Sequence, residues 1–404
     1  MLVKGDIPAK EPIVSIGLVL PEDKKDSISV VDLNNNVSLI IDLTFQEKYL
    51  PNSTYTLSTI RAGRGFHWEK EIEITVNGEL EFKLMDGFLF VINHIPLEKY
   101  LVCVATSEMS GECPPALLES QTIAARSWLL AASEQKHVDL GLDACNDDCC
   151  QRYQGIGNVT KEAQRAVEKT RGNVLTFENE ICDTRYSKSC GGMSEHNENV
   201  WHDEPKLYLR GITDGEDTSV IDLPSEQDLA QWIEEPPRSF CGPDFIPESQ
   251  LKKYLGHVDK SGHYFRWDVT YSQSELTQLI SEKTGREFDT IESLQPLNRG
   301  VSGRITLLRI QGISNRESVS LHLKSEYEIR RVLHPKFLFS SAFIIEANST
   351  PNAPPSQVTF KGAGWGHGVG LCQIGALGMA LDGYATSDIL SHYFQSTELK
   401  KIYD

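Results

Sequence analysis

Residues 95–108 carry the clearest helical pattern in the chain. The positions that share one face at 3.6 residues per turn are Leu97, Leu101, Val104, Ala105 and Glu108. Four of them are apolar, and the fifth is a carboxylate followed by Met109. Pro96 precedes the stripe, where a helix readily begins. The pattern predicts a helix that ends with a glutamate on its apolar face.

Glu108 allows two interpretations at this point. Burial disfavours a charged carboxylate, so a buried Glu108 would tend to hold its proton, as a general acid must. Alternatively, Glu108 marks the end of the stripe and points into solvent, because charged side chains are rarely buried without a partner. The periodicity leaves both interpretations open.

A second helix is predicted after Pro114-Pro115, running to about Gln135. Its inward face again carries a polar residue, Gln121, and its many small side chains allow a close approach to another helix. Arg126 lies on this helix, where it could reach a carboxylate such as Glu119 or Glu108. An ordinary surface arginine is the alternative.

Residues 12–92 show the alternation of strands. Apolar positions alternate over 72–76 and over 80–84, and Asn77-Gly78 between them is typical of a type I′ turn, so a hairpin is predicted. Further elements are predicted from caps and periodicity. They are a helix capped by Thr160 and ending at Gly172, strands at 174–177, 181–186, 304–312 and 318–323, and helices at 274–282 and 387–394.

The order of these elements predicts an α+β fold with mixed helices and antiparallel strands. We expect a β-rich N-terminal region at residues 1–92, packed on a catalytic part at 93–404. Residues 202–265 are proline-containing, acidic and poor in periodic pattern, which indicates a loop-rich insertion of that part.

The charge of the chain excludes some classes of partner. Its 404 residues include 39 basic and 57 acidic side chains, a formal net charge of −18 with 11 histidines counted neutral. This balance argues against nucleic acid and against electrostatic attachment to anionic lipid or wall polymers. The apolar run Ile13–Leu20 is too short to span a membrane. No secretory signal is recognisable near Lys4 and Asp6, so we expect a cytosolic protein or a mature form.

Two local compositions suggest chemistry or close packing. Nine cysteines are too few for a disulfide scaffold, but Cys145, Cys149 and Cys150 are clustered. Glycine occupies every second position from 362 to 370, which leaves one side of an extended chain bare and lets another backbone or a ligand approach. This spacing is neither a Walker loop nor a dinucleotide fingerprint.

A set of motifs in the chain resembles the stage II sporulation protein D family, which includes the amidase enhancers of bacterial cell-wall turnover. The matching stretches occur in family order and are residues 95–109, 116–128, 149–155, 166–177, 186–192, 198–201, 300–305, 362–380 and 392–394. Each is weak alone, whereas the ordered set is specific. The resemblance implies a SpoIID-like catalytic domain.

The resemblance also implies an activity. Such proteins are peptidoglycan lytic transglycosylases, which cleave peptide-stripped glycan strands between N-acetylmuramic acid and N-acetylglucosamine and leave 1,6-anhydro-muramic ends. The family's catalytic glutamate in the Ser-Glu-Met motif corresponds to Glu108. Most glycosidases use two carboxylates, but an attack by the sugar's own C6 hydroxyl removes the need for a second. Neither Glu112 nor Glu119 is an equally good candidate for one.

Further site residues follow from the same resemblance. Those expected to bind the glycan are Gln121, Arg126, Tyr186, Ser189, Trp201, His367 and Gln373. Some members bind zinc before the Gln-x-Tyr motif, which here implies His137, Cys145 and Cys150 as structural zinc ligands, with Cys149 as an extra candidate. A disulfide or free thiols are the alternatives. The family implies a location in the cell envelope and a cooperating amidase as partner.

Three features depart from the family pattern, and two other functions remain open. Cys372 stands where many relatives have serine, the 202–265 insertion is unusual, and the export signal is missing. The chain could instead be a non-catalytic glycan-binding module that stimulates an amidase. A third hypothesis is a wall hydrolase with Cys190 as nucleophile and His367 as base.

Overall fold

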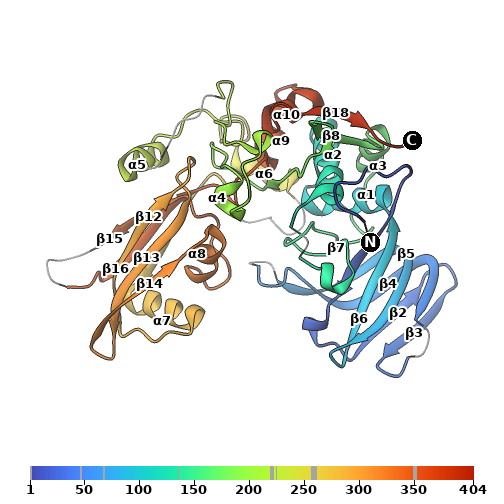
Figure 1. Cartoon of the computed structure of the whole chain (residues 1–404), viewed down its shortest axis with the longest axis horizontal. Coiled ribbons are helices and arrows are strands. Elements are labelled where there is room, and N and C mark those ends of the chain that lie inside the picture. The colour runs from blue at the N-terminus through green and yellow to red at the C-terminus, as the bar shows by residue number, and fades with distance from the viewer. Residues whose placement is uncertain are drawn as a thin grey trace. The chain divides into compact units, whose positions relative to one another are not determined.

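The computed structural model describes residues 2–45, 48–66, 69–134, 136–218, 223, 225–255, 262–348 and 353–404. The chain forms two compact units. Unit 1 comprises residues 1–184, 252–260 and 397–404, and unit 2 comprises 185–251 and 261–396. The fold is α+β with an N-terminal sheet rich in antiparallel pairs, as the sequence predicts (Figure 1). The predicted boundary at residue 92 falls inside unit 1.

Unit 1 is built on a seven-stranded sheet in the order β3-β2-β4-β5-β6-β1-β7. Its strands are β1 (Ile13–Val19), β2 (Ser27–Asp32), β3 (Val37–Asp42), β4 (Tyr49–Ala62), β5 (Lys70–Met85), β6 (Phe88–Pro96) and β7 (Ala144–Cys145). Neighbouring strands are antiparallel except for β1 and β7, which pair in parallel. A 3-10 turn, η1 (Pro21–Asp23), joins β1 to β2.

The hairpin predicted at Asn77-Gly78 is wrong. Strand β5 runs through both residues, and Gly78 pairs with Ser53 of β4. Gly78 has φ +119°, and a Cβ there would lie 2.3 Å from the His94 carbonyl oxygen, so this glycine serves a close approach within the sheet. The β5–β6 turn lies at Asp86-Gly87, where both φ values are positive, as a type I′ turn requires.

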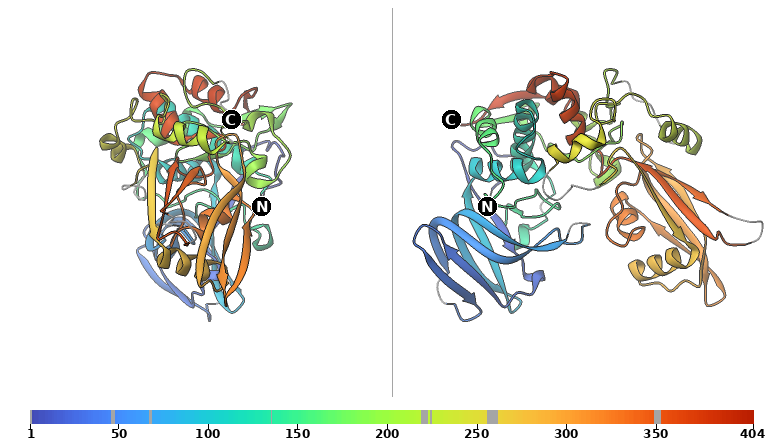
Figure 2. Two further views of the ribbon diagram at one scale, coloured as in Figure 1. Left: turned by 90° about the vertical axis from the view of Figure 1, so that its left-hand side faces the viewer. Right: turned by 180° about the vertical axis from the view of Figure 1, so that it is seen from behind.

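Three helices follow the sheet in unit 1: α1 (Leu97–Glu108), α2 (Pro115–Ala131) and α3 (Lys161–Lys169). They gather at one end of the sheet in both views of the chain (Figure 2). Helix α2 ends before the predicted position near Gln135, which lies outside the described residues. The Thr160 hydroxyl accepts a hydrogen bond from the Ala163 N–H at 3.2 Å, which confirms the predicted cap.

A small sheet made of β18 (Glu398–Lys401), β8 (Asn173–Phe177) and β9 (Glu180–Ile181) completes unit 1. The strand predicted over 181–186 is shorter than expected. Its last part forms β10 (Tyr186–Ser187), which pairs in parallel with β17 (Leu371–Cys372) of unit 2.

A buried ion pair joins α1 to α2. Arg126 is 0% exposed, and its guanidinium donates to both carboxylate oxygens of Glu98, at 2.9 and 2.6 Å. Glu98 also accepts from the Tyr403 hydroxyl at 2.6 Å and from the Gly172 N–H at 3.3 Å. The fifth hydrogen bond of this network runs from Arg126 to the Asn173 carbonyl at 2.9 Å.

The expectation that Arg126 reaches a carboxylate is confirmed, but the partner is Glu98 and not Glu119 or Glu108. A buried guanidinium needs a buried carboxylate with matching fork geometry, and Glu98 supplies it. Glu119 instead accepts from Lys169 at 2.7 Å. The interior position of Arg126 gives it a structural role in unit 1.

The core of unit 2 lies between two three-stranded sheets and two helices. One sheet has the order β11 (Arg266–Ser272), β16 (Gln357–Ala363), β15 (Phe343–Ala347), and the other β12 (Thr290–Arg299), β13 (Ile305–Ser314), β14 (Glu317–Leu323). Helices α7 (Gln273–Thr284) and α8 (Glu326–Val332) share this core. The helix predicted at 274–282 and the strands predicted at 304–312 and 318–323 are confirmed.

The predicted insertion is loop-rich with short helices. It follows α4 (Glu198–Trp201) and contains η3 (Leu207–Leu209), α5 (Glu226–Glu234) and the start of α6 (Glu248–Tyr254). Residues 219–222, 224 and 256–261 lie outside the described part. Leu229 and Trp232 of α5 pack with Met193 in a small core of unit 2. The C-terminal part of unit 2 forms α9 (Gln373–Leu381) and α10 (Thr386–Tyr393).

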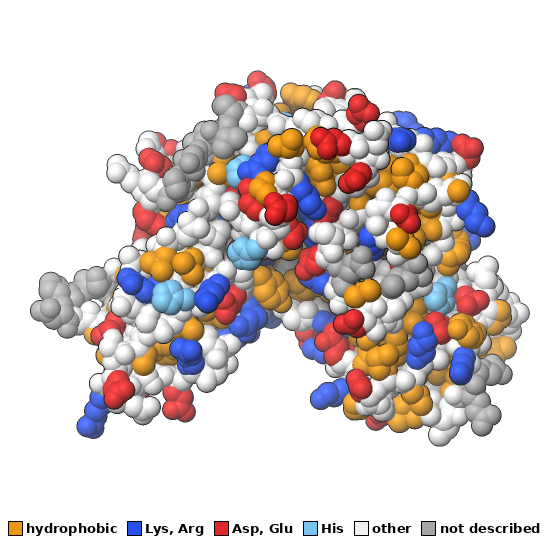
Figure 3. Space-filling view, in the orientation of Figure 1, with side chains coloured by type: hydrophobic (Ala, Val, Ile, Leu, Met, Phe, Trp, Pro, Cys, Tyr) orange, Lys and Arg blue, Asp and Glu red, His pale blue; other side chains and the backbone are white. Residues whose placement is uncertain are grey.

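Two surface properties bear on the partners. Within the described ranges, no helix is both long and apolar enough to cross a bilayer. On the face shown in Figure 3, basic side chains are interspersed with acidic ones rather than gathered into a patch.

The buried ion pair yields a prediction for stability. Replacing Arg126 by leucine leaves the Glu98 carboxylate buried without its cation, so the free energy of unfolding should fall by about 3–5 kcal/mol. Urea unfolding measures this change. The matched control is Arg61→Leu, because Arg61 pairs with Glu69 at 2.8 Å in a part-exposed pair whose loss should cost under about 1 kcal/mol. Equal losses in both variants would contradict the assignment.

Candidate active site and cysteine clusters

Glu108 is buried at the end of α1. Glu108 is 7% exposed, and its Oε1 atom accepts a hydrogen bond from the Arg152 backbone N–H at 3.0 Å. The burial agrees with the first interpretation of the helical stripe and not with a solvent-directed glutamate. The backbone donor gives the carboxyl group a fixed orientation.

Residues 151–155 hold that donor in place. Gln151 accepts from the Tyr100 hydroxyl at 3.0 Å and donates to the Ala125 carbonyl at 3.1 Å, so it bridges α1 and α2. The Gln154 N–H donates to the Ser107 hydroxyl at 3.0 Å, beside Glu108. The loop is thereby fixed to the end of α1.

Tyr153 fixes the same loop to the sheet. Its ring stacks on that of Tyr100 with 5.2 Å between centroids, and its hydroxyl donates to Asn93 of β6 at 2.8 Å. A Cβ on Gly155 would lie 2.1 Å from the Thr75 carbonyl oxygen, so only glycine permits this approach to β5. The site carboxylate thus rests on a rigid frame of helices and sheet.

The other two carboxylates considered from the sequence have different surroundings. Glu112 is exposed, and its carboxylate lies 4.0 Å from the Lys253 ammonium group. Glu119 is buried but held by Lys169. Gln121 lies in the interior of α2 at 1% exposure.

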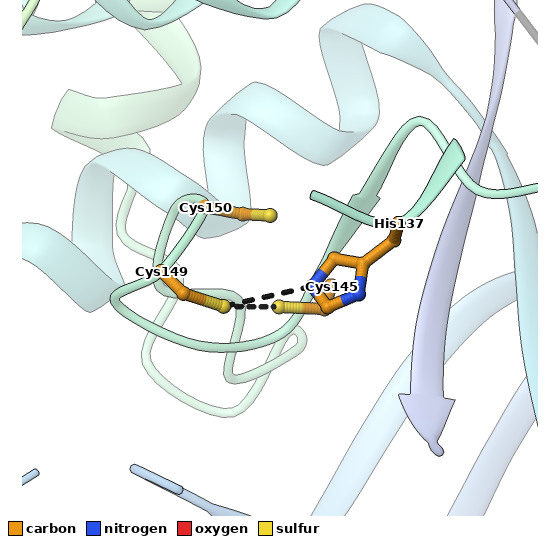
Figure 4. A group of neighbouring side chains, drawn as sticks. All are labelled: His137, Cys145, Cys149 and Cys150. Carbon is orange, nitrogen blue, oxygen red and sulfur yellow. Dashed lines mark hydrogen bonds between the residues drawn. The ribbon is translucent and has the colours of Figure 1, made fainter. Parts of the chain in front are cut away.

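The first cysteine cluster lies in unit 1, in the segment that leads to residues 151–155 (Figure 4). It consists of His137, Cys145, Cys149 and Cys150, whose donor atoms all lie within 4.8 Å of one another. The Cys145 and Cys149 sulfurs are 3.2 Å apart, and the Cys149 sulfur is 3.6 Å from His137 Nε2. His137 precedes η2 (Val138–Leu140), and Cys145 lies in β7.

This donor set fits a metal ion such as zinc. Four tetrahedral ligands about 2.3 Å from zinc lie roughly 3.8 Å from one another, and three thiols with one imidazole are a common structural set. Hydrogen bonds from the Cys145 and Cys149 thiols hold the pKa of Cys150 well below its ordinary value. Cys149 completes the set that the sequence left with three members and one extra candidate.

The cluster is anchored to the sheet on one side and to the candidate active site on the other. Cys145 pairs with Gly17 of β1. Arg64 contacts the Asp147 carboxylate and donates to Asn146 at 2.8 Å and to Asp23 at 2.5 Å. Cys150 is followed directly by the residues that contact α1 and Glu108.

Unit 2 brings together some of the other predicted residues. The Trp201 and His367 rings meet edge to face with centroids 4.9 Å apart, and the Arg185 guanidinium lies 4.3 Å from the Trp201 ring centroid. Tyr186 is partly exposed on β10, next to Arg185. Gln373 is the buried first residue of α9.

The glycine-rich segment packs against residues 185–191, as its spacing predicts. Ser189 and Trp365 exchange backbone hydrogen bonds of 3.0 and 2.7 Å. A Cβ at Gly364 would lie 2.8 Å from the Cys190 carbonyl oxygen, and one at Gly370 would lie 2.1 Å from that of Arg185. The expectation of an extended chain is wrong beyond Ala363, however. The later glycines, Gly364, Gly366, Gly368 and Gly370, all have positive φ.

The 300–305 motif supports this segment through Arg304. Its guanidinium is buried and donates to Ser302 at 2.9 Å and to the Cys190 carbonyl at 3.3 Å. A Cβ at Gly368 would lie 2.3 Å from the Arg304 guanidinium carbon. Sequence reasoning matched the motif but gave this arginine no role.

The geometry does not favour a hydrolase with Cys190 and His367. Burial raises the pKa of the Cys190 thiol well above its ordinary value, and the sulfur contacts Asp214 at 3.4 Å and Cys241 at 3.7 Å. Burial and the charge of Arg185 lower the pKa of His367, and His367 Nδ1 accepts from the Val369 N–H at 3.0 Å. A protonated, buried thiol is a poor nucleophile.

Cys190 belongs instead to a second group of possible metal ligands, together with Asp214, Cys241 and Cys372. All four are buried in unit 2. The sequence gave no signal for this group, because its members are dispersed and two of them lie in the loop-rich region.

Comparisons with known proteins give two family matches and several distant relatives. Residues 86–177 match the family described as stage II sporulation protein (SpoIID), and residues 195–370 match a domain of unknown function, DUF8618. The chain is 25% identical over 325 residues to stage II sporulation protein D of Bacillus amyloliquefaciens, covering 77% of this chain and 76% of that protein.

Two further similarities are of the same order. An uncharacterized protein of Brachyspira hyodysenteriae is 23% identical over 345 residues, which cover 83% of this chain and 76% of that protein. The amidase enhancer of Bacillus subtilis is 24% identical over 302 residues, which cover 73% of this chain but 39% of the enhancer.

The close packing of the glycine-rich segment can be tested by substitution. Gly370→Ala should destabilise the protein more than Gly383→Ala. Both positions have positive φ, which costs a side chain about 1–2 kcal/mol, but a Cβ at Gly383 meets nothing within 4 Å. The clash at Gly370 should add about 1–3 kcal/mol, measured as the difference between the two variants in urea unfolding. Equal destabilisation would contradict the close approach.

Proposed function

Because the chain contains a SpoIID-family domain and is distantly homologous to stage II sporulation protein D over most of its length, we propose that it is a peptidoglycan lytic transglycosylase. The family has roles in peptidoglycan remodelling. The substrate is a glycan strand from which the stem peptides have been removed. The observation that carries the proposal is the buried, oriented carboxyl group of Glu108.

The reaction needs one carboxyl group acting twice. Protonated Glu108 donates its proton to the glycosidic oxygen between N-acetylmuramic acid and N-acetylglucosamine, and the bond from that oxygen to muramic C1 breaks. The resulting carboxylate takes the proton from the C6 hydroxyl of the same muramic acid, whose oxygen bonds to C1. The 1,6-anhydro ring closes, Glu108 is protonated again, and no water is consumed.

The surroundings of Glu108 suit both steps. The carboxyl group is largely shielded from water, and the Arg152 N–H is placed to stabilise the carboxylate that forms on cleavage. A second carboxylate is not required for this route, in contrast to hydrolysis. The partners of Glu112 and Glu119 are consistent with this, since each is directed to a lysine.

We also propose that His137, Cys145, Cys149 and Cys150 hold a structural zinc ion. When bound, zinc would cross-link the segment before residue 151 and exchange no group with the substrate. The bound ion would thereby also restrict the positions of Gln151 and Arg152, which directly follow the cluster. The chain's own residues carry the chemistry, with Arg152 positioning the carboxyl group of Glu108.

Other residues supply the proposed glycan contacts. Tyr186 and Trp201 are partly exposed and can present aromatic surface to sugar rings. Ser189, Gln373 and Gln121 are buried, so they fit a role in shaping the site. His367 supports Trp201 through their edge-to-face contact. We propose a cell-envelope location and a cooperating amidase, which would supply the peptide-free strands.

A second candidate function is stimulation of an amidase by glycan binding without cleavage. It is favoured by the similarity to a protein named amidase enhancer. This function needs the glycan-binding surface but not the proton of Glu108.

The decisive variant is Glu108→Gln, which keeps the shape of the side chain but cannot donate an acidic proton. Digestion of amidase-treated glycan strands should release anhydro-ended sugars with the wild type. The variant's rate should fall about a hundred- to ten-thousand-fold. Mass spectrometry of the products measures this. Glu112→Gln, on a neighbouring exposed carboxylate, should keep the wild-type rate.

Other outcomes decide between the remaining functions. If neither the wild type nor the Glu108→Gln variant cleaves the glycan, but each accelerates an added amidase, the enhancer function is supported. Cleavage that persists in Glu108→Gln would overturn the role of this residue.

The zinc proposal is tested by metal content. A Cys145→Ser/Cys150→Ser variant should lose about one zinc equivalent per chain relative to the wild type. Inductively coupled plasma mass spectrometry measures the zinc content. Removal of zinc from the wild type by a chelator should lower its thermal midpoint, because the ligands fold around the metal. An unchanged metal content in the double variant would sink this assignment.

A further inference from the structure

We propose that Cys190, Asp214, Cys241 and Cys372 form a second structural zinc site, located entirely within unit 2. It is distinct from the cluster of His137, which belongs to unit 1. The proposal does not depend on the glycan-cleaving activity, because it concerns how unit 2 is held together.

The ligand atoms already surround a common centre. All four lie within 4.8 Å of one another. The Cys190 sulfur is 3.7 Å from that of Cys241 and 3.4 Å from Asp214 Oδ2. These separations are close to the roughly 3.8 Å expected between tetrahedral ligands of zinc, and three thiolates with one carboxylate use donor types that zinc accepts.

Backbone and side-chain donors orient these ligands from outside. The Cys372 sulfur accepts from the Cys190 N–H at 3.2 Å and from the Gly375 N–H at 3.3 Å. Asp214 Oδ2 accepts from the Cys241 N–H at 3.1 Å. Such bonds to the ligand atoms are typical of structural metal sites, where they fix geometry and offset negative charge.

The second oxygen of Asp214 is held in the same manner. Asp214 Oδ1 accepts from the Tyr393 hydroxyl at 2.6 Å, and His392 Nε2 lies 3.6 Å from it. A Cβ at Gly375 would lie 2.1 Å from the Tyr393 hydroxyl and 2.7 Å from Asp214 Oδ2, so only glycine leaves room for this arrangement. The oxygen that faces the three sulfurs is therefore fixed.

A disulfide or a reactive thiol accounts for less of this arrangement. The 3.7 Å between Cys190 and Cys241 is far from the roughly 2.05 Å of a disulfide, and a disulfide would leave Cys372 and Asp214 buried together without a cation. A nucleophile needs access that these buried thiols lack. One divalent cation uses all four groups.

The site would join segments that are distant in sequence. Cys190 follows β10, Asp214 and Cys241 lie in loops of the 202–265 region, and Cys372 lies in β17 at the start of α9. Zinc binding would release the thiol protons to solvent as the three sulfurs become ligands. The loop-rich insertion would thereby be tied to the C-terminal helices of unit 2.

The test is the zinc stoichiometry of the full-length chain purified under reducing conditions. We expect about two zinc equivalents per chain in the wild type and about one fewer in Cys241→Ser/Cys372→Ser. The matched control, Cys103→Ser, removes a buried thiol outside both clusters and should keep the wild-type content. The Cys145→Ser/Cys150→Ser variant separates the two sites, because it should retain the zinc of unit 2 whether or not the first site binds.

A measurement on the wild type covers the case in which the double variant does not fold. Under native conditions, Cys190, Cys241 and Cys372 should resist alkylation with zinc bound and react after chelation, as peptide mapping will show. Cys103 is buried in α1 outside both clusters, so chelation should leave it unreacted. Unchanged zinc content in the folded double variant, alkylation that is independent of chelation, or a native Cys190–Cys241 disulfide would each overturn the proposal.

Discussion

The arrangement of unit 1 depends on the need to neutralise the buried guanidinium charge of Arg126. Arg126 is fully enclosed, and its charge is tolerable only because Glu98 meets it with both oxygens. That requirement fixes the start of α1 against α2. The other end of α1 is fixed by residues 151–155, which bring a backbone donor to Glu108. The candidate acid is therefore placed by a helix held at both of its ends.

Local sequence signals were sufficient to predict features that are determined by neighbouring residues. The apolar stripe of α1 led to Glu108, and Thr160 predicted the start of α3, because periodicity and caps act within a few residues. The hairpin prediction at Asn77-Gly78 failed for the same reason. An Asn-Gly dipeptide in a turn cannot be distinguished by sequence from one whose glycine permits close approach between strands. The turn at Asp86-Gly87 carries the same kind of signal.

Partnerships across long separations could not be predicted. Several carboxylates along the chain were possible partners for Arg126, and only the packing of α1 against α2 selects Glu98. Cys149 was an ambiguous neighbour until the loop placed its sulfur between Cys145 and His137. Cys372 was recognisable only as a departure from the serine of many relatives, yet its sulfur lies in a buried group with Asp214 and Cys241. The family motifs narrowed the candidates for the active site, but they include neither Asp214 nor Cys241.

The position of residues 397–404 has a consequence for how the protein is made. Strand β18 pairs with β8, and Tyr403 donates to Glu98, so the last residues of the chain complete a unit that the first 184 residues begin. All of unit 2 is synthesised in between. Residues 397–404 therefore join unit 1 only after the residues of unit 2 have been synthesised, so unit 2 can fold before unit 1 is complete.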